Sequence, residues 1–469
     1  MDAEGELRAN MAAALGLAFD PEAVRITGHA TLDSAYPVSD LATATVATAA
    51  LAAADLCTVI SHPSPAVSLD RTLVDTWFGY ALSPIGWSLP SVWDAIAGDY
   101  ATLPDASGRP GWIKLHTNAS HHRAAALRVL GVEAVKERVA EAVARWLPDE
   151  LEAAVVAEGG CAAVLRTPVE WAEHPQGVAV AAEPLVAREV TDSNSRFDSR
   201  WSPTEVRPLA GLRVLDLTRV LSGPVATRLL AGLGANVLRI DSLTWDEPGI
   251  VPDMTIGKRA ARLDAEDPAD HAKLLELLAG ADVLVHGYRS DALERLGLGV
   301  AVRQATRPGL VDVSLDAYGH TGPWATRRGF DSLVQMSSGI AGSGLQSGLA
   351  DRPTPLPVQA LDHGTGYLIA AAALSGLAAR VRTGRGSRAR LSLARTALEL
   401  ERARHFAKQP ATAPPTSGTE PVTSQTYLRT PIDTPWGPAT LPPPPFRLEG
   451  VRIGWDRGPR ALGSDAPAW

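Results

Sequence analysis

The second half of the chain alternates short, continuously apolar runs with longer amphipathic segments. Runs of this length that are apolar throughout are typical of strands buried on both faces of a sheet. Strands are predicted at 213–218, 236–241, 282–285 and 310–315, and helices at 222–232, 269–278 and 291–296. Because strands and helices alternate, the pattern predicts an α/β fold with an open parallel sheet and covering helices.

The first half, to about Ala187, has a mostly helical pattern. Apolar residues recur at spacings of three and four in 121–130 and again in 132–146. Thr167, followed by Pro168 and by Glu170 three positions on, has the signature of a capped helix start.

Two segments far apart in the sequence resemble each other. Asp40 and Asp362 each stand at the head of an Ala-rich helical stretch. A shared Ser-Leu-x-Arg-Thr string begins 28 residues after Asp40, at Ser68, and 30 residues after Asp362, at Ser392. Alanine-rich composition does not account for the matching flanks, so we expect a partial internal duplication.

Composition changes divide the chain into four parts. Residues 188–207 are polar without periodicity, which is typical of a linker. Past Gln409 the chain becomes Pro-rich, and we expect that tail to be extended or looped over the surface. The predicted organisation is an incomplete first copy at 1–187, a linker at 188–207, a large domain at 208–409 and a tail at 410–469.

Charge and composition exclude several classes of protein. With 469 residues and a net charge of −8, the chain lacks the basic excess that nucleic-acid binding requires. Two cysteines cannot form a disulfide framework. The Ala-rich stretches 41–56 and 368–379 are shorter than the roughly 20 apolar residues of a membrane span. The first residues do not resemble a signal peptide, so we expect a soluble, cytoplasmic protein without membrane contact.

The strand–helix–strand unit at the start of the large domain could bind a dinucleotide, with Asp241 on the ribose. However, the turn after the first strand contains Gly223 followed by proline instead of the G-x-G-x-x-G run that lets backbone approach a pyrophosphate. An NAD enzyme is therefore disfavoured.

Eight strings between Leu212 and Gly386 resemble family III CoA-transferases, which include formyl-CoA transferase, the carnitine CoA-transferases and the α-methylacyl-CoA racemases. They occur in the family's order. The strings are Leu212–Pro224, Leu233–Asp241, Gly257–Arg259, Ala281–Arg289, Leu293–Gly299, Tyr318–Pro323, Gly329–Asp331 and Arg382–Gly386.

The first half resembles a different part of the same family. Gly111–His116, His122-Arg123 and Arg166–Trp171 are similar to the small domain that follows the Ala-rich helix. The resemblance implies a Rossmann-like large domain and a mostly helical small domain. Two incomplete copies would together form one transferase unit.

The resemblance also implies a chemistry. The family's nucleophilic aspartate corresponds to Asp362, which would form a mixed anhydride and then an aspartyl-CoA thioester that an acceptor carboxylate opens. We expect the helix N-terminus to favour the ionised carboxylate, and Gly364 and Gly366 to let a thioester approach the backbone. The alternative for Asp362 is a plain helix N-cap. We expect that role for Asp40, because Ala42 and Ala44 stand where the second copy has glycine.

We expect CoA as a substrate, with no tightly bound cofactor and no metal, and a homodimer. Acyl-CoA and carboxylic acid would be the other partners. The residues expected to contact CoA are Val220, Leu221, Ser222, Lys258, Arg259, Tyr288, Arg289 and Gly364.

Two alternatives stay open. A racemase of the same family needs a histidine where this chain has Phe330, and either His320 or His363 would have to replace it. A CoA-binding paralogue without activity is the other alternative. His116, His121 and His122 lack accompanying acidic or cysteine ligands, so a solvated helix start is a better interpretation than a metal site.

Overall fold

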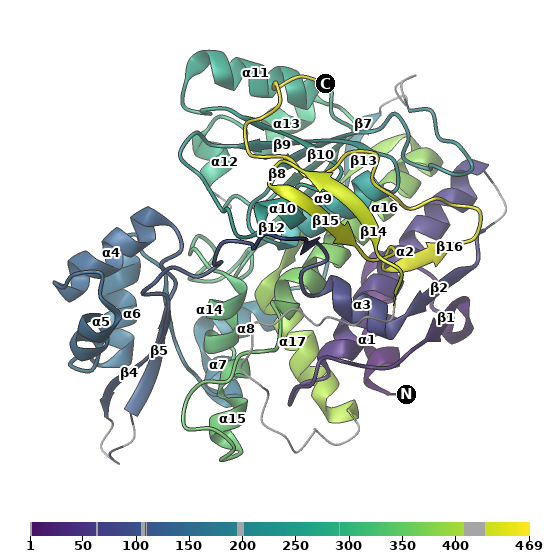
Figure 1. Cartoon of the computed structure of the whole chain (residues 1–469). Coiled ribbons are helices and arrows are strands. Elements are labelled where there is room, and N and C mark those ends of the chain that lie inside the picture. Colours follow the sequence, from purple (N-terminus) through teal and green to yellow (C-terminus); the bar gives the residue numbers. More distant parts are fainter. Residues whose placement is uncertain are drawn as a thin grey trace.

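A seven-stranded sheet forms the centre of the large domain in the computed structural model (Figure 1). The structure describes residues 2–61, 64–104, 108, 110–194, 201–289, 291–407 and 427–469. The strand order is β10-β9-β8-β11-β12-β13-β7, and all neighbours are parallel except β13 and β7. The strands are β7 (Ala187–Asn194), β8 (Arg213–Leu217), β9 (Asn236–Asp241), β10 (Lys258–Arg262), β11 (Val283–His286), β12 (Val311–Asp316) and β13 (Arg385–Ser392).

The sheet confirms the predicted α/β class. The four strands predicted from apolar runs are present, and helices connect them as expected. Because strand order reverses between β8 and β11, a crevice opens at the carboxyl ends of these two strands. The helices of this half are α9 (Ser222–Gly232), α10 (Val251–Met254), α11 (Pro268–Ala279), α12 (Ala292–Arg295), α13 (Val300–Thr306), α14 (Asp331–Ser337), α15 (Ser343–Gln346), α16 (Ala360–Thr383) and α17 (Leu393–Ala403), with 3-10 turns η2 (Ile340–Gly342) and η3 (Arg404–Phe406).

Two long Ala-rich helices, α2 (Val38–Ser61) and α16, lie side by side (Figure 1). Each is followed by a strand and a helix: β2 (Val67–Asp70) and α3 (Arg71–Trp77) after α2, β13 and α17 after α16. The two segments with matching sequence flanks therefore share one order of elements.

Both long helices exceed the lengths expected from the sequence. They are long and apolar enough to cross a membrane, but 72% and 89% of their most apolar windows are buried inside the protein. Their apolar surfaces are thus occupied by intramolecular packing.

Residues 98–164 form a smaller lobe with its own core, seen at the left of Figure 1. Three antiparallel strands, which the sequence pattern did not predict, pack against three short helices. The predicted capping box at Thr167 and Glu170 is confirmed at the start of α7. The elements are β4 (Gly98–Pro104), β5 (Pro110–Leu115), β6 (Ala162–Val164), α4 (Ser120–Leu130), α5 (Lys136–Val143) and α6 (Pro148–Ala157); α7 (Pro168–Glu173) and α8 (Pro175–Ala182) follow, and α1 (Ala3–Leu15), η1 (Pro21–Ala23), β1 (Val24–Thr27) and β3 (Ser83–Pro84) complete the first half.

The predicted linker is partly a strand. Its first residues, 188–194, belong to β7 at the sheet edge, and 195–200 lie outside the described residues. The Glu189 carboxylate pairs with Arg388 and Arg390 of β13 at 3.3 and 3.2 Å. The segment lacks an apolar pattern because charged cross-strand pairs, rather than burial, hold this edge.

The tail joins the two halves. Its strands are β14 (Thr430–Thr434), β15 (Gly437–Leu441) and β16 (Phe446–Leu448). β15 pairs with β3 and β16 pairs with β2, while the Trp469 indole donates to the carbonyl of Leu277 on α11 at 2.9 Å. Residues 408–426 of the Pro-rich region lie outside the described part.

Close helix packing predicts opposite effects at two glycines of α16. A Cβ on Gly366 would lie 2.5 Å from the carbonyl oxygen of Ser222, whereas a Cβ on Gly364 would meet Leu41 at an ordinary 3.5 Å. We expect Gly366→Ala to destabilise the fold by about 1–3 kcal/mol through overpacking. Gly364→Ala, the matched control, should be neutral or stabilising by up to about 1 kcal/mol through helix propensity. Thermal unfolding midpoints test both, and equal shifts would contradict this packing.

Candidate active site

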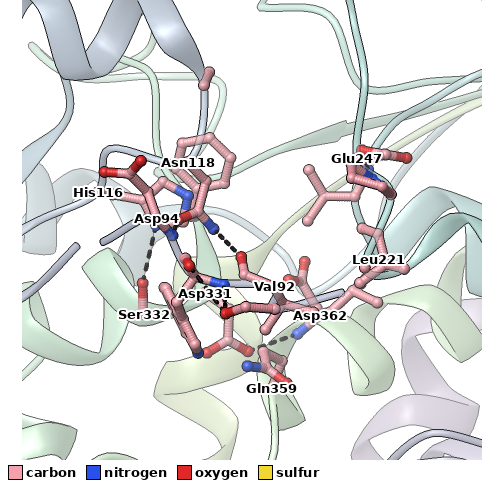
Figure 2. Close-up of a pocket in the computed structure, with 18 of the residues that line it drawn as sticks. Val92, Asp94, His116, Asn118, Leu221, Glu247, Asp331, Ser332, Gln359 and Asp362 are labelled. Atoms are coloured by element: carbon pink, nitrogen blue, oxygen red, sulfur yellow. Dashed lines mark hydrogen bonds between the residues drawn. The ribbon is translucent and has the colours of Figure 1, made fainter. Parts of the chain in front are cut away.

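Asp362 lies in the first turn of α16, but its side chain does not cap the helix. The N-cap position is Gln359, which makes no side-chain capping bond. Instead, Asp331 at the start of α14 accepts the backbone N–H groups of Leu361 and Asp362 at 2.9 and 3.0 Å (Figure 2). The helix-cap interpretation of Asp362 is therefore wrong, because its carboxylate does not cap the helix.

The Asp362 carboxyl is held in a setting that disfavours its charge. Burial, with the residue 7% exposed, and the neighbouring Asp331 carboxylate raise the pKa of Asp362 well above its usual range. A backbone N–H from Ser222 donates to the carboxylate and acts in the opposite direction. Burial also raises the pKa of Asp331, to about 6. The helix N-terminus was expected to favour the ionised form of Asp362. Burial and the Asp331 carboxylate outweigh that effect, because Asp331 already accepts the terminal N–H groups.

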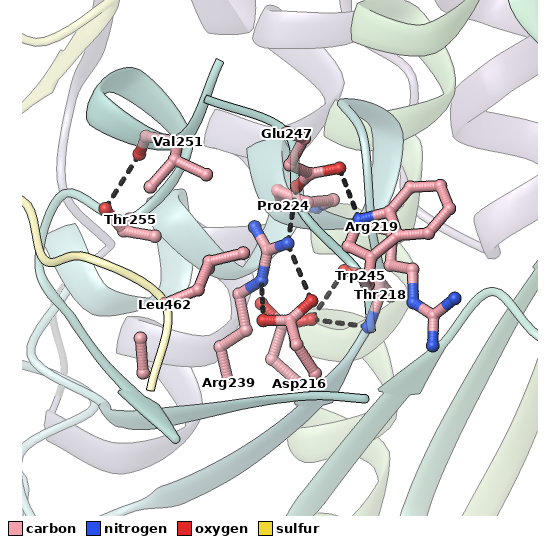
Figure 3. A network of polar contacts seen from close by, with 12 residues as sticks. Asp216, Thr218, Arg219, Pro224, Arg239, Trp245, Glu247, Val251, Thr255 and Leu462 are labelled. Carbon is pink, nitrogen blue, oxygen red and sulfur yellow. Dashed lines mark hydrogen bonds and ion pairs between the residues drawn. The ribbon is translucent and has the colours of Figure 1, made fainter. Parts of the chain in front are cut away.

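The loop that supplies the Ser222 N–H is strained. Val220 has φ 63°, a left-handed conformation that costs a β-branched residue on the order of 1–3 kcal/mol. Its N–H donates to Glu247 at 3.0 Å, and the indole of Trp245 donates to the same carboxylate at 2.8 Å. The buried guanidinium of Arg239 also pairs with Glu247 (Figure 3). This network fixes the loop beside Asp362.

A second buried network includes Lys258, which was predicted to contact CoA. Lys258 is fully buried, and its ammonium contacts Asp216 and the carbonyl of Pro224, both at 3.0 Å. Arg259 donates to Asn236 at 3.2 Å. Both belong to the edge strand β10 rather than to a loop, and neither lines a cavity beside Asp362. Full burial and pairing with Asp216 contradict a CoA contact for Lys258, whereas a CoA contact of Arg259 stays an untested prediction.

Gly364, which was also predicted to contact CoA, is packed between helices. It faces Leu41 of α2, and Gly366 faces the carbonyl of Ser222 on α9. These glycines allow helices to approach one another, and neither lines a cavity next to Asp362.

Asp362 lines two cavities, which we call the crevice cavity and the inter-half cavity. The crevice cavity opens at the carboxyl ends of β8, β11 and β12, where the sheet order reverses. Four of the residues predicted to contact CoA line this cavity: Val220, Ser222, Tyr288 and Arg289. Its cationic lining residues are Arg219, Arg289, Arg327 and Arg328.

The inter-half cavity lies between the first half of the chain and the loops after β8 and β9 (Figure 2). Leu221 and Val220 line it from the second half. The first-half residues in its lining were not predicted as site residues: Tyr80, Ser91, Val92, Trp93, Asp94, His116, Asn118 and Ala119. Both halves thus supply walls to one carboxylate.

The histidines are arranged differently from expectation. His116 is buried and stacks on Phe330 with ring centroids 3.7 Å apart, and buried His122 lines the crevice cavity. Burial lowers the pKa of each to about 3. The interpretation as a solvated helix start is therefore wrong for both. The racemase candidates His320 and His363 line neither cavity.

Asp40, the counterpart of Asp362 in the first half, has a different environment. Its carboxylate pairs with Arg71 at 2.5 Å, and it lines neither of the two cavities. An aspartate at the same place in the repeated pattern is therefore neutralised by an ion pair.

Residues 209–428 match the family model described as CoA-transferase family III. An acyl-CoA transferase of Gibberella moniliformis is 31% identical over 295 residues, which are 58% of this chain and 51% of that protein. The acetyl-coenzyme A transferase nodX of Hypoxylon pulicicidum is 34% identical, over 44% of this chain and 36% of that protein. A succinyl-CoA:glutarate CoA-transferase of Mus musculus is 34% identical, over 39% and 44%. The chain spans about half, or less, of the length of these relatives.

The raised pKa of Asp362 predicts a pH-dependent stability effect. A carboxyl whose pKa is higher in the folded state loses stability as pH rises above the unfolded value of about 3.9, and the loss is complete above the folded value. Asp362→Asn keeps an acceptor for Ser222 but cannot ionise. We expect it to stabilise the fold by about 1–3 kcal/mol at pH 8, and by much less at pH 4.

Thermal unfolding at the two pH values measures this difference. Asp40→Asn is the control, because it removes a partly exposed ion pair and should change stability by less than about 1 kcal/mol. An Asp362→Asn variant that is equally stabilised at both pH values, or destabilised at pH 8, would contradict the electrostatic description.

Proposed function

Because residues 209–428 match the model of CoA-transferase family III, we propose that the protein transfers CoA from an acyl-CoA to a carboxylic acid through Asp362. The observation that carries the proposal is the position of this buried carboxylate at the junction of two cavities. The relatives' names, acyl-CoA transferase and succinyl-CoA:glutarate CoA-transferase, support it. Residues of one chain line both cavities at Asp362. Homodimer formation remains a prediction.

The crevice cavity is the proposed CoA site. It lies at the switch point of the sheet, where open α/β sheets bind ligands. Three of its arginines, Arg219, Arg289 and Arg328, are suited to the phosphates of CoA, because guanidinium groups pair with phosphate through two hydrogen bonds. The fourth, Arg327, already pairs with Glu152 at 3.1 Å. The pantetheine arm would then extend toward Asp362, which lines the same cavity.

The chemistry follows from the position of the carboxylate. Ionised Asp362 attacks the thioester carbonyl, an oxygen–carbon bond forms, and CoA leaves as the thiolate from a mixed anhydride. The thiolate attacks the aspartyl carbonyl and releases the first acid, which leaves an aspartyl-CoA thioester. The acceptor carboxylate attacks that thioester and releases the thiolate, which takes the new acyl group and returns Asp362 to a carboxylate.

The Ser222 N–H is the proposed oxyanion donor. It already donates to the Asp362 carboxylate, so it is placed to stabilise the oxygen of a tetrahedral intermediate formed at that carboxyl carbon. The strained loop and its Glu247 contacts hold this donor in place before the reaction begins.

Substitution of Asp362 tests the proposal against a matched aspartate. We expect Asp362→Asn to reduce the turnover number for CoA transfer by roughly 1000-fold or more, because an amide cannot form the anhydride. Asp40→Asn should retain turnover within about twofold, since Asp40 lines neither cavity. Transfer is measured by mass spectrometry of the acyl-CoA products. Full turnover of the Asp362→Asn variant would rule out the nucleophile.

A second pair of variants tests the CoA site. Arg289→Ala should weaken CoA binding about tenfold, since Arg289 lines the crevice cavity. Arg259→Ala, the same substitution at a residue that lines neither cavity, should leave the dissociation constant for CoA unchanged. Isothermal titration calorimetry with CoA measures both, and equal weakening by the two variants would contradict the assignment.

A further inference from the structure

The two cavities that meet at Asp362 differ in charge. The crevice cavity has four arginines in its lining, whereas the described lining of the inter-half cavity includes neither lysine nor arginine. The inter-half cavity instead has five carboxylates: Asp94, Asp246, Glu247, Asp331 and Asp362.

The cations around these carboxylates pair with carboxylates of the protein, and Lys114, whose charge acts on Asp331, pairs with Asp99 at 2.8 Å. Asp94 pairs with Arg123 at 2.9 Å and also accepts from Thr117 at 2.8 Å. Glu247 pairs with Arg239, which is fully buried and also pairs with Asp241 at 2.9 Å. Neither arginine lines the cavity. A negative group that entered would therefore find these cations bound to the protein's own carboxylates.

The rest of the wall is uncharged. Aromatic and aliphatic side chains form much of it, and the imidazole of His116 is neutral at pH 7 because burial lowers its pKa to about 3. These aromatic and aliphatic lining residues include Tyr80, Trp93, Leu221, Trp245, Ile250 and Phe330.

We propose that the inter-half cavity holds the acyl group and that it selects monocarboxylic acids with uncharged tails and rejects dicarboxylic acids. This inference rests on the proposed CoA transfer through Asp362. The reacting carboxyl group meets Asp362, and the tail extends along the uncharged wall. A second carboxylate would lose water of hydration and face Asp331 and Glu247 with neither lysine nor arginine in the described lining, which is strongly unfavourable.

An exchange reaction in which the acyl group of the donor and the free acceptor acid are the same compound tests the acyl site alone. Only one acid then has to fit the cavity. Butyryl-CoA is incubated with ¹³C-labelled butyrate, and succinyl-CoA with ¹³C-labelled succinate. These acids have the same chain length and differ in the terminal methyl or carboxylate. We expect kcat/KM for butyrate exchange to exceed that for succinate by roughly 100-fold or more, as unpaired buried charge implies.

The outcomes separate the two proposals. Succinate exchange as fast as butyrate exchange, dependent on Asp362, would overturn the selectivity and leave CoA transfer intact. Exchange of neither acid, with no CoA adduct on Asp362, would overturn the proposed function and this inference with it.

Asp246 offers a charge test at the cavity mouth. It is exposed, and its carboxylate accepts the backbone N–H of Glu247 at 3.0 Å. Asp246→Lys should raise the succinate-to-butyrate ratio of kcat/KM about tenfold, by supplying a cation to the second carboxylate. Asp246→Asn, the control, should raise it less. A ratio unchanged in both variants would overturn the inference.

Discussion

Two carboxylates buried together at the start of one helix are the constraint on which the site depends. Asp331 accepts the N–H groups of Leu361 and Asp362, so it satisfies the helix terminus from a neighbouring helix. Asp362 is thereby left with a carboxyl group that is buried, close to another carboxylate and held by the Ser222 N–H. We expect this arrangement to reduce stability near neutral pH while it leaves the proposed nucleophile free of a helix-capping role, a trade-off that is common at active sites.

The fold brings cavity walls from distant parts of the chain together at that carboxylate. The reversal of strand order places the arginine-lined crevice cavity on one side of the α16 terminus. The packing of α2 on α16 and the strands of the tail bring the first half to the other side. Both halves of the chain therefore supply walls to the cavities at Asp362, while Asp40 at the head of α2 pairs with Arg71.

The sequence was informative where local pattern decides structure. Apolar runs predicted the parallel sheet, and the family strings singled out Asp362 among the aspartates. Lys258 was misjudged because a charged run at a sheet edge has the same local pattern as a solvated loop, although Lys258 is paired with Asp216, 42 positions away. Asp94 and His116 were missed because their proximity to Asp362 comes from tertiary packing across more than half the chain, which no local periodicity records. Asp331 stood within a recognised string, but its role depends on a contact with the α16 terminus.

Peptide mass spectrometry of the enzyme quenched during turnover determines whether Asp362 carries CoA as a covalent thioester. We expect that a peptide containing Asp362 gains the mass of CoA less one water, and that addition of acceptor acid removes this adduct. Turnover that proceeds with no adduct on that peptide, or with the adduct on another residue, would contradict it.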